Sequence, residues 1–138
     1  MDAPTINATH LAEAIGRWNA GDLDGYLRLY APSIRLVGYA GVEPGIDSVR
    51  VFYRALWEAF ATPKIAVEDQ IAVGDKVVCR FVMTARHTGA FQGLPATGRD
   101  IVLPGITILR FEDGRCVERW SQADFLGLMV QLGAVPAP

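Results

Sequence analysis

The hydrophobic pattern of this chain changes its period once, near Lys64, from the period of a helix to that of a strand. Before the change, the apolar residues of 49–60 recur at i, i+3, i+4, i+7, i+8 and i+11, which is the spacing of one broad, aromatic helix face. After it, apolar and polar residues alternate, as in a strand with one buried face. Helices and strands that come in separate runs predict an α+β fold.

Turn and cap signals set the boundaries of the expected elements, and Asp113-Gly114 is a strong hairpin signal. The expected helices are 6–19, a short one that Asp22 caps and Pro32 closes, with Tyr30 on its inward face, 49–60 and 125–132. The expected strands are 34–37 at a sheet edge, 64–73, 77–87, 101–111 and 116–123. An aromatic helix face packed on the concave side of a curved antiparallel sheet leaves a pocket. We therefore expect one domain over 1–138, shaped as a cone with an apolar cavity.

Composition and charge indicate which classes of binding partner to expect. The chain has 138 residues, a formal charge of -2 and no run of like charges, which argues against a nucleic-acid groove or an anionic membrane as partner. Hydrophobic residues make up 51% and charged residues 20%, so apolar surface is in excess. We expect this excess to line a cavity for an apolar small molecule, to form the interface of a homodimer or higher homo-oligomer, or both.

The compartment is expected to be the cytoplasm. Residues 1–10 lack the basic and apolar regions of a secretory signal. Cys79 and Cys116 show no CxxC spacing, so they are expected to be reduced, buried thiols.

Asp124 is the first candidate for chemistry. It follows the last strand, where Glu118, Trp120 and Gln122 alternate onto the same side as Asp124. If that side is the concave one, an apolar site raises the pKa of the carboxyl and makes it a proton carrier near neutral pH. The alternative is structural, because Asp before a helix is a favoured N-cap.

His87 and Gln122 are the other two candidate catalytic residues. His87 ends the strand 77–87, whose apolar side carries Phe81 and Met83, so its imidazole is expected at the rim of the cavity as a proton carrier or hydrogen-bond donor. Alternatively it bonds the loop 89–98, which is rich in glycine and proline. Gln122 is expected to hold a carbonyl oxygen. His10 has no evident partner and is expected at the surface.

Aromatic residues are numerous for so small a domain, and each one alone is expected in the core. Together they are the expected lining of the ligand pocket: Trp18, Tyr26, Tyr30, Tyr53, Trp57, Phe60, Phe81, Met83 and Trp120. Two isolated histidines give no metal-ligand spacing, and no nucleotide-binding or serine-nucleophile motif is present. We expect no metal and no cofactor.

Four segments of the second half resemble the SnoaL-like polyketide cyclase family: TARHTG at 84–89, GLPATGR at 93–99, DGRCVERW at 113–120 and DFLGLMVQLG at 124–133. The resemblance is firm over 74–134 and weak from residue 6. It implies a cone of the nuclear transport factor two-like (cystatin-like) type, oligomeric and free of metals and cofactors. It also implies that Asp124 is the acid/base of an intramolecular aldol ring closure.

The leading functional hypothesis is therefore a cofactor-independent acid/base enzyme acting on an apolar, carbonyl-bearing molecule, most simply by aldol cyclisation through Asp124. An isomerase or hydratase on the same scaffold is not separated from it by sequence. The alternative from another class is a module that binds a small ligand, or assembles, without chemistry.

Overall fold

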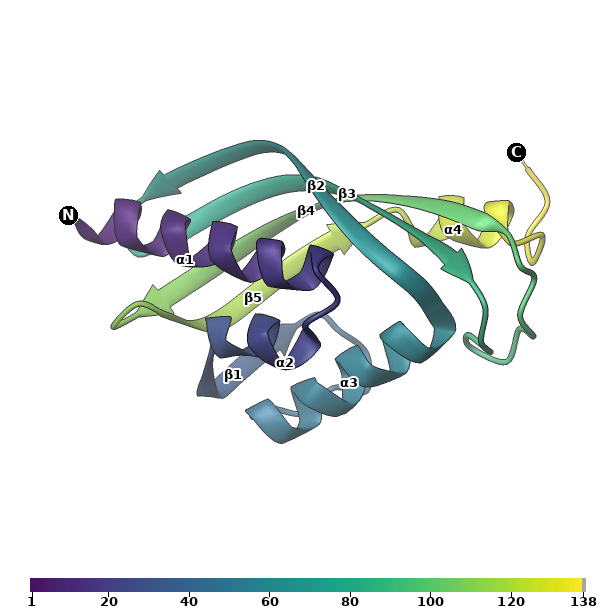
Figure 1. The fold of residues 1–138 in the computed structure, drawn as a ribbon, viewed down its shortest axis with the longest axis horizontal. Helices are drawn as coiled ribbons and strands as arrows, with labels where there is room; N and C mark the ends of the chain where they lie inside the picture. Colours follow the sequence, from purple (N-terminus) through teal and green to yellow (C-terminus); the bar gives the residue numbers. More distant parts are fainter. Residues whose placement is uncertain (138) are drawn as a thin grey trace.

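One curved sheet of five strands, with helices on its concave side, makes up the computed structural model, which describes residues 1–137 (Figure 1). The helices are α1 (Ala3–Asn19), α2 (Leu23–Tyr26), the 3-10 helix η1 (Leu27–Leu29), α3 (Ile46–Ala59) and α4 (Phe125–Gln131). The strands are β1 (Tyr30–Val37), β2 (Phe60–Val73), β3 (Lys76–His87), β4 (Asp100–Glu112) and β5 (Arg115–Ala123). The expected α+β class, with helices first and a curved sheet second, is confirmed.

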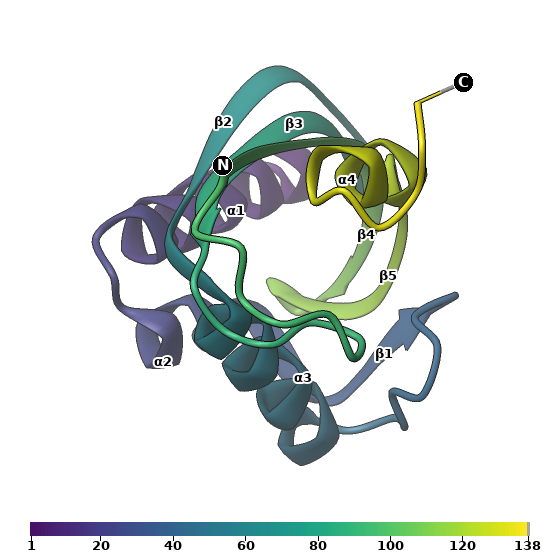
Figure 2. The ribbon, with the colours of Figure 1, turned by 90° about the vertical axis from the view of Figure 1, so that its right-hand side faces the viewer.

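The strands lie in the order β1-β5-β4-β3-β2, and β1 and β2 are its two edges, so the sheet is open. All neighbours pair antiparallel except β1, which runs parallel to β5. The expected edge strand is confirmed but begins at Tyr30, four residues earlier. Seen from the end that carries α4, strands β2 to β5 curve around the interior, with α1 beneath β2 and β3 and α3 across the interior from them (Figure 2).

Three of the helices begin at an aspartate whose side chain caps the N-terminus. The carboxylate of Asp2 accepts the Thr5 N–H at 3.1 Å, so α1 begins before the apolar periodicity does. Asp22 accepts the Gly25 N–H at 2.9 Å and starts α2, as its sequence position predicts. Asp124 starts α4 in the same way, and Gly133 follows that helix with a φ of 77°, as expected of a C′ glycine.

The two faces of β3 divide as their alternation predicts. Cys79, Met83 and His87 are buried on the concave side. The opposite, convex side carries Arg80, which pairs with Glu68, and Arg86, whose Nε lies 3.0 Å from Asp100. These are exposed pairs within one chain, each worth about 1 kcal/mol or less.

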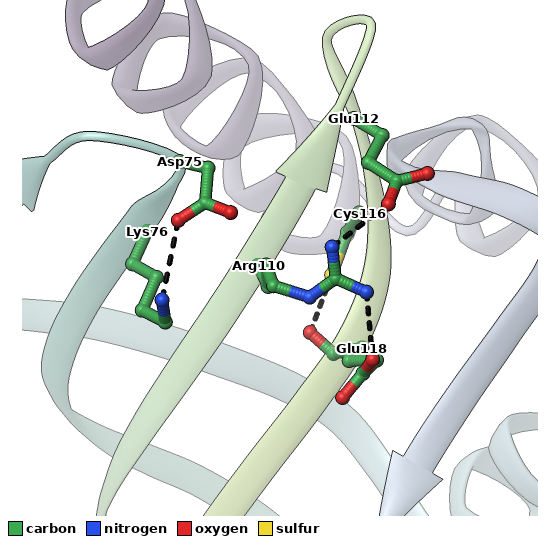
Figure 3. A network of polar contacts seen from close by, with 6 residues as sticks. All are labelled: Asp75, Lys76, Arg110, Glu112, Cys116 and Glu118. Carbon is green, nitrogen blue, oxygen red and sulfur yellow. Dashed lines mark hydrogen bonds and ion pairs between the residues drawn. The ribbon is translucent and has the colours of Figure 1, made fainter.

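A β-bulge at Val117 reverses the faces of β5. Cys116 lies opposite Phe111 but Glu118 lies opposite Arg110, so β5 has one residue more than β4 across this step. Glu118 therefore points to the convex side, where its carboxylate accepts from Arg110 at 2.6 Å (Figure 3). Beyond the bulge, Arg119, Ser121 and Ala123 face the concave side.

The remaining sequence expectations concern single residues. Both cysteines are buried free thiols, as expected. His10 differs from expectation: it is half-buried, and its Nδ1 lies 2.6 Å from the carbonyl oxygen of Gly114 in the β4–β5 turn. No helix within residues 1–137 is long and apolar enough to cross a membrane.

Candidate functional site

A cavity of about 320 Å³ lies between the concave face of the sheet and helices α1 and α3. This volume is within the range of small-molecule sites. Its lining is mostly apolar and aromatic, with a few polar groups on one wall. The lining residues are Trp18, Tyr26, Gly38, Tyr39, Ala40, Phe52, Tyr53, Leu56, Ile65, Phe81, Met83, Gln92, Leu103, Arg119, Ser121, Ala123 and Phe125.

The polar wall is built around Arg119, which is only 8% exposed. Its Nη1 donates to three tyrosine hydroxyls: Tyr26 at 2.7 Å, Tyr30 at 2.7 Å and Tyr53 at 3.2 Å. The three hydroxyls also bond one another, since Tyr30 lies 2.6 Å from Tyr26 and 2.7 Å from Tyr53. We call Arg119 and these three tyrosines the Arg–Tyr cluster.

A second set of hydroxyls holds the other side of the guanidinium. Arg119 Nε donates to Thr107 Oγ1 at 2.8 Å. Thr107 Oγ1 also accepts from Ser121 at 2.8 Å and donates to the Trp120 carbonyl at 3.0 Å. Ser121 in turn accepts from the Tyr39 hydroxyl at 2.6 Å. With Nε and Nη1 both bonded, the plane of the guanidinium is fixed.

Two tyrosines of the cluster, Tyr30 and Tyr53, are held in the neutral form. Burial raises the pKa of Tyr30 and of Tyr53 well above the ordinary value, and the positive charge of Arg119 offsets this only in part. Burial acts to lower the pKa of the Arg119 guanidinium, but its tyrosine neighbours together outweigh it, and the pKa lies above its ordinary value. The cavity wall therefore carries one fixed positive charge, bonded to hydroxyl groups.

The structure places five of the nine predicted pocket residues on the lining: Trp18, Tyr26, Tyr53, Phe81 and Met83. The other four lie elsewhere for separate reasons. Tyr30 lies behind the lining and bonds the other two tyrosines of the cluster. Trp57 packs edge-on against Trp18 at 5.0 Å.

Phe60 and Trp120 are the remaining two predicted pocket residues. Phe60 is fully buried between His87 and Phe91, at 5.3 and 5.0 Å between ring centres. Trp120 belongs to the convex face of β5 because of the bulge, and it is only half-buried.

Asp124 and Gln122 do not line the cavity. Gln122 is exposed on the convex face, and the condition attached to Asp124, that this face be concave, is not met. Asp124 is exposed, and its Oδ1 accepts the Gly127 N–H at 2.8 Å, which is the N-cap geometry. Its chain neighbours Ala123 and Phe125 both line the cavity, so its backbone lies at the cavity edge.

His87 is fully buried next to the loop that follows β3. Its Nδ1 accepts the Thr97 N–H at 3.2 Å and lies 3.0 Å from the Thr97 hydroxyl. This is the loop-bonding arrangement weighed in the sequence. Because Nδ1 accepts a backbone N–H, the ring proton of the neutral imidazole is on Nε2.

Three site residues are not predicted by the sequence pattern: Arg119, Ser121 and Tyr39. Strict alternation from Cys116 predicts that Glu118 and Gln122 face the cavity. In the structure the extra residue at Val117 turns them to the convex side, and Arg119 and Ser121 face the cavity instead. A faint signal was present: Cys116 and Val117 are adjacent apolar residues at the start of the strand, and both are buried. Within residues 1–137, no group of three or more His, Cys, Asp or Glu side chains is placed to hold a metal ion.

The family model for SnoaL-like polyketide cyclases matches residues 9–132, which is most of the chain. The chain belongs to the SnoaL-like polyketide cyclase family. Among curated proteins, aklanonic acid methyl ester cyclase DauD from Streptomyces sp. (strain C5) is 30% identical over 95 residues. That match covers 66% of this chain and 59% of DauD, so this chain spans less than two thirds of that relative.

Solved structures of similar proteins agree on the fold. TsrD from Streptomyces laurentii is 32% identical with a TM-score of 0.84, over 94% of this chain and 96% of that one. IdmH from Streptomyces antibioticus, a proposed polyketide cyclase, is 29% identical with a TM-score of 0.78, over 92% and 98%. The fold of this chain is therefore shared with solved relatives over nearly its whole length.

Proposed function

We propose that this protein binds a flexible, apolar, carbonyl-rich small molecule in its cavity and closes a ring in it by an intramolecular aldol reaction, without a cofactor. The observation that carries the proposal is the mostly apolar cavity of about 320 Å³ in a member of the SnoaL-like polyketide cyclase family. Such a cavity folds a flexible chain so that its reacting carbons meet, which removes much of the entropic part of the barrier.

The proposed chemistry needs only proton transfer. A base takes a proton from a carbon between two carbonyls, and the electron pair moves into an enolate. The enolate carbon bonds to the carbon of a further carbonyl group in the same molecule. The oxygen of that group becomes an alkoxide, which takes the proton back. Atoms balance without a redox partner, so the product has the mass of the substrate.

Asp124 is the proton carrier in this proposal. Its backbone is flanked by the cavity-lining residues Ala123 and Phe125, which supports the assignment. Its carboxylate now accepts the Gly127 N–H, so a rotation of the Asp124 side chain has to accompany the reaction. The roles predicted for His87 and Gln122 stay predictions, and the turnover of His87→Asn and Gln122→Leu tests them.

The test is turnover of aklanonic acid methyl ester, the compound that appears in the name of the relative DauD. The reaction is monitored by chromatography and NMR, because substrate and product have the same mass. Asp124→Asn keeps a good N-cap residue but removes the acid/base. We expect it to lower kcat by about 10² or more with unchanged stability. Asp113→Asn, a substitution in the β4–β5 turn, is the matched control and should turn over normally. Full turnover by Asp124→Asn would refute the role of Asp124.

A binding module without chemistry is the second candidate. It is favoured by one observation: none of the three predicted catalytic residues lines the cavity within the described residues 1–137. It predicts that an apolar compound is carried through purification and recovered unaltered after prolonged incubation. Conversion of the carbonyl compound by the wild type but not by Asp124→Asn would exclude it.

A further inference from the structure

The charge of Arg119 has no counter-charge in the protein. The side chain is 8% exposed, yet it makes no ion pair with any residue of 1–137. By contrast, Arg80 and Arg110 on the convex side both pair with glutamates. Removing a charge from water costs several kcal/mol, and buried charges are normally paired.

The surrounding hydroxyls solvate this charge but do not neutralise it. Tyr26, Tyr30 and Tyr53 accept from Nη1, and Thr107 accepts from Nε. These bonds, the only ones to Arg119 side-chain nitrogens within residues 1–137, leave Nη2 unbonded. The interior wall therefore keeps a full positive charge whose orientation is fixed before any ligand enters.

Arg119 also faces the place where a ligand would lie. It lines the cavity together with two of its hydroxyl partners, Tyr26 and Tyr53, while the rest of the wall is mostly apolar. In such surroundings a charge-assisted hydrogen bond to an anion is stronger than in water, because little water competes for it. A purely apolar ligand offers no hydrogen-bond acceptor to the guanidinium, so Arg119 would not strengthen its binding.

We propose that Arg119 binds an oxyanion carried on an apolar ligand, with Tyr26 and Tyr53 as additional hydrogen-bonding groups and Thr107 as the residue that positions the guanidinium. This inference rests on the proposed function in taking the cavity as the ligand site. If the ligand reacts there by enolate formation, the oxyanion is the enolate oxygen, and Arg119 stabilises it from a preorganised position. A carboxylate on the ligand would meet the same group.

The experiment compares matched pairs of probes on the full chain by titration calorimetry. The first pair is naphthoate and naphthamide, which share a skeleton but differ in charge. The second pair is an acidic nitronaphthol, ionised at neutral pH, and its methyl ether, which stand for the enolate type of oxyanion. We expect the anion of at least one pair to bind about tenfold or more tightly than its neutral partner. The pair with the larger ratio identifies the type of oxyanion.

Three variants test whether Arg119 causes the preference. Arg119→Met should reduce the ratio of affinities to about one, while the neutral probe binds as before. Arg119→Lys keeps the charge without the fork of donors, and should keep part of the preference. It also provides the test if the Met variant fails to fold. Thr107→Val, which frees the guanidinium, should lower the ratio less than Arg119→Met does.

The outcomes separate this inference from the proposed function. Equal affinities within both pairs, or a preference that survives in Arg119→Met, overturns the oxyanion site even if the protein turns over a carbonyl substrate. Binding of no probe, charged or neutral, overturns both, because the cavity is then not a ligand site. A preference for the anion without turnover supports the oxyanion site and favours the binding module over the cyclase as the function of the protein.

Discussion

A Cβ atom on Gly105 would lie 2.7 Å from Cζ of Phe81 and 3.1 Å from the carbonyl oxygen of Gln122. Gly105 in β4 pairs with Phe81 in β3, and both point to the concave side. The missing side chain thus makes room for the Phe81 ring, which lines the cavity. A small residue on one strand sets the position of a large one on the next.

Gly105→Ala should therefore displace the Phe81 ring and destabilise the protein. We expect a loss of about 1–3 kcal/mol in the free energy of unfolding, measured by urea denaturation. Phe81→Leu in the same chain should recover part of it, because the clashing ring atom is removed. Gly16→Ala in α1 is the matched control: a Cβ there meets nothing within 4 Å, and the change should stabilise the helix. Equal effects at the two glycines would contradict this account.

Alkaline pH should destabilise the protein. Burial raises the pKa of Tyr30 and Tyr53 well above the ordinary value, and raises the pKa of the Cys116 thiol to about 12. The unfolded chain releases these protons near pH 8.5 for Cys and near pH 10 for Tyr, whereas the folded chain still holds them. The folded state then binds more protons, so the stability present below about pH 8.5 is lost as pH rises.

Urea denaturation at a series of pH values measures this loss. Tyr53→Phe should flatten the decline above about pH 10, because one shifted group is removed. The Cys116 thiol donates to the Glu118 carbonyl at 3.2 Å (Figure 3), a contact that also requires the proton. A stability that stays constant up to pH 11 or so would show that these groups titrate alike in both states.

Asp124 should contribute to stability as a helix cap. Asp124→Ala removes the acceptor for the Gly127 N–H and should lower the free energy of unfolding by about 1 kcal/mol. Asp124→Asn should change it by only a few tenths, since Asn caps about as well. Thermal and urea unfolding of the two variants measure the difference. Equal losses would mean that the carboxylate charge, and not the cap bond, stabilises α4.

Oligomerisation stays a prediction, and the convex face of the sheet is where we expect the interface. Three aliphatic side chains of β4 are exposed there: Val102 at 48%, Ile106 at 50% and Ile108 at 37%. An exposed apolar row of this kind is typical of a protein interface. We expect light scattering at micromolar concentration to give a dimer or larger species, and Ile106→Lys to shift it toward the monomer. Surface Val51→Lys on α3 is the control. A monomeric wild type would refute the prediction.

Local signals were enough to predict most of the fold. The change of period near Lys64 separated the helices from the strands, and Asp22 and Gly133 marked true helix ends. The start of α1 was missed because Asp2 caps residues that carry no apolar periodicity. The apolar spacing after Asp22 places Tyr30 in the short helix that Pro32 closes, whereas in the structure Tyr30 begins β1. Tyr30 is held there by long-range bonds of its hydroxyl to Arg119 and Tyr53.

The site was less predictable than the fold. Aromatic residues on a helix face point to the core or to a cavity, which is why the sequence predicts three of the lining residues: Trp18, Tyr26 and Tyr53. These side chains are buried and also line the cavity. Arg119 was not found, because its orientation depends on an extra residue in β5 that only pairing with β4 reveals. The position of a bulge depends on pairing with the neighbouring strand, which is a long-range property, and alternation within one strand does not locate it.

The bulge at Val117 has an evolutionary consequence. Deleting Val117 would close the bulge but would leave Arg119, Ser121 and Ala123 facing inward, because Glu118 would then follow Cys116 directly and would still pair with Arg110. If β5 kept all its residues and paired without the bulge, this row would turn outward, and Glu118, Trp120 and Gln122 would turn inward. The extra residue is therefore a point where the strand absorbs a change in length, and a related chain with one codon fewer here would keep the same ligand-facing wall.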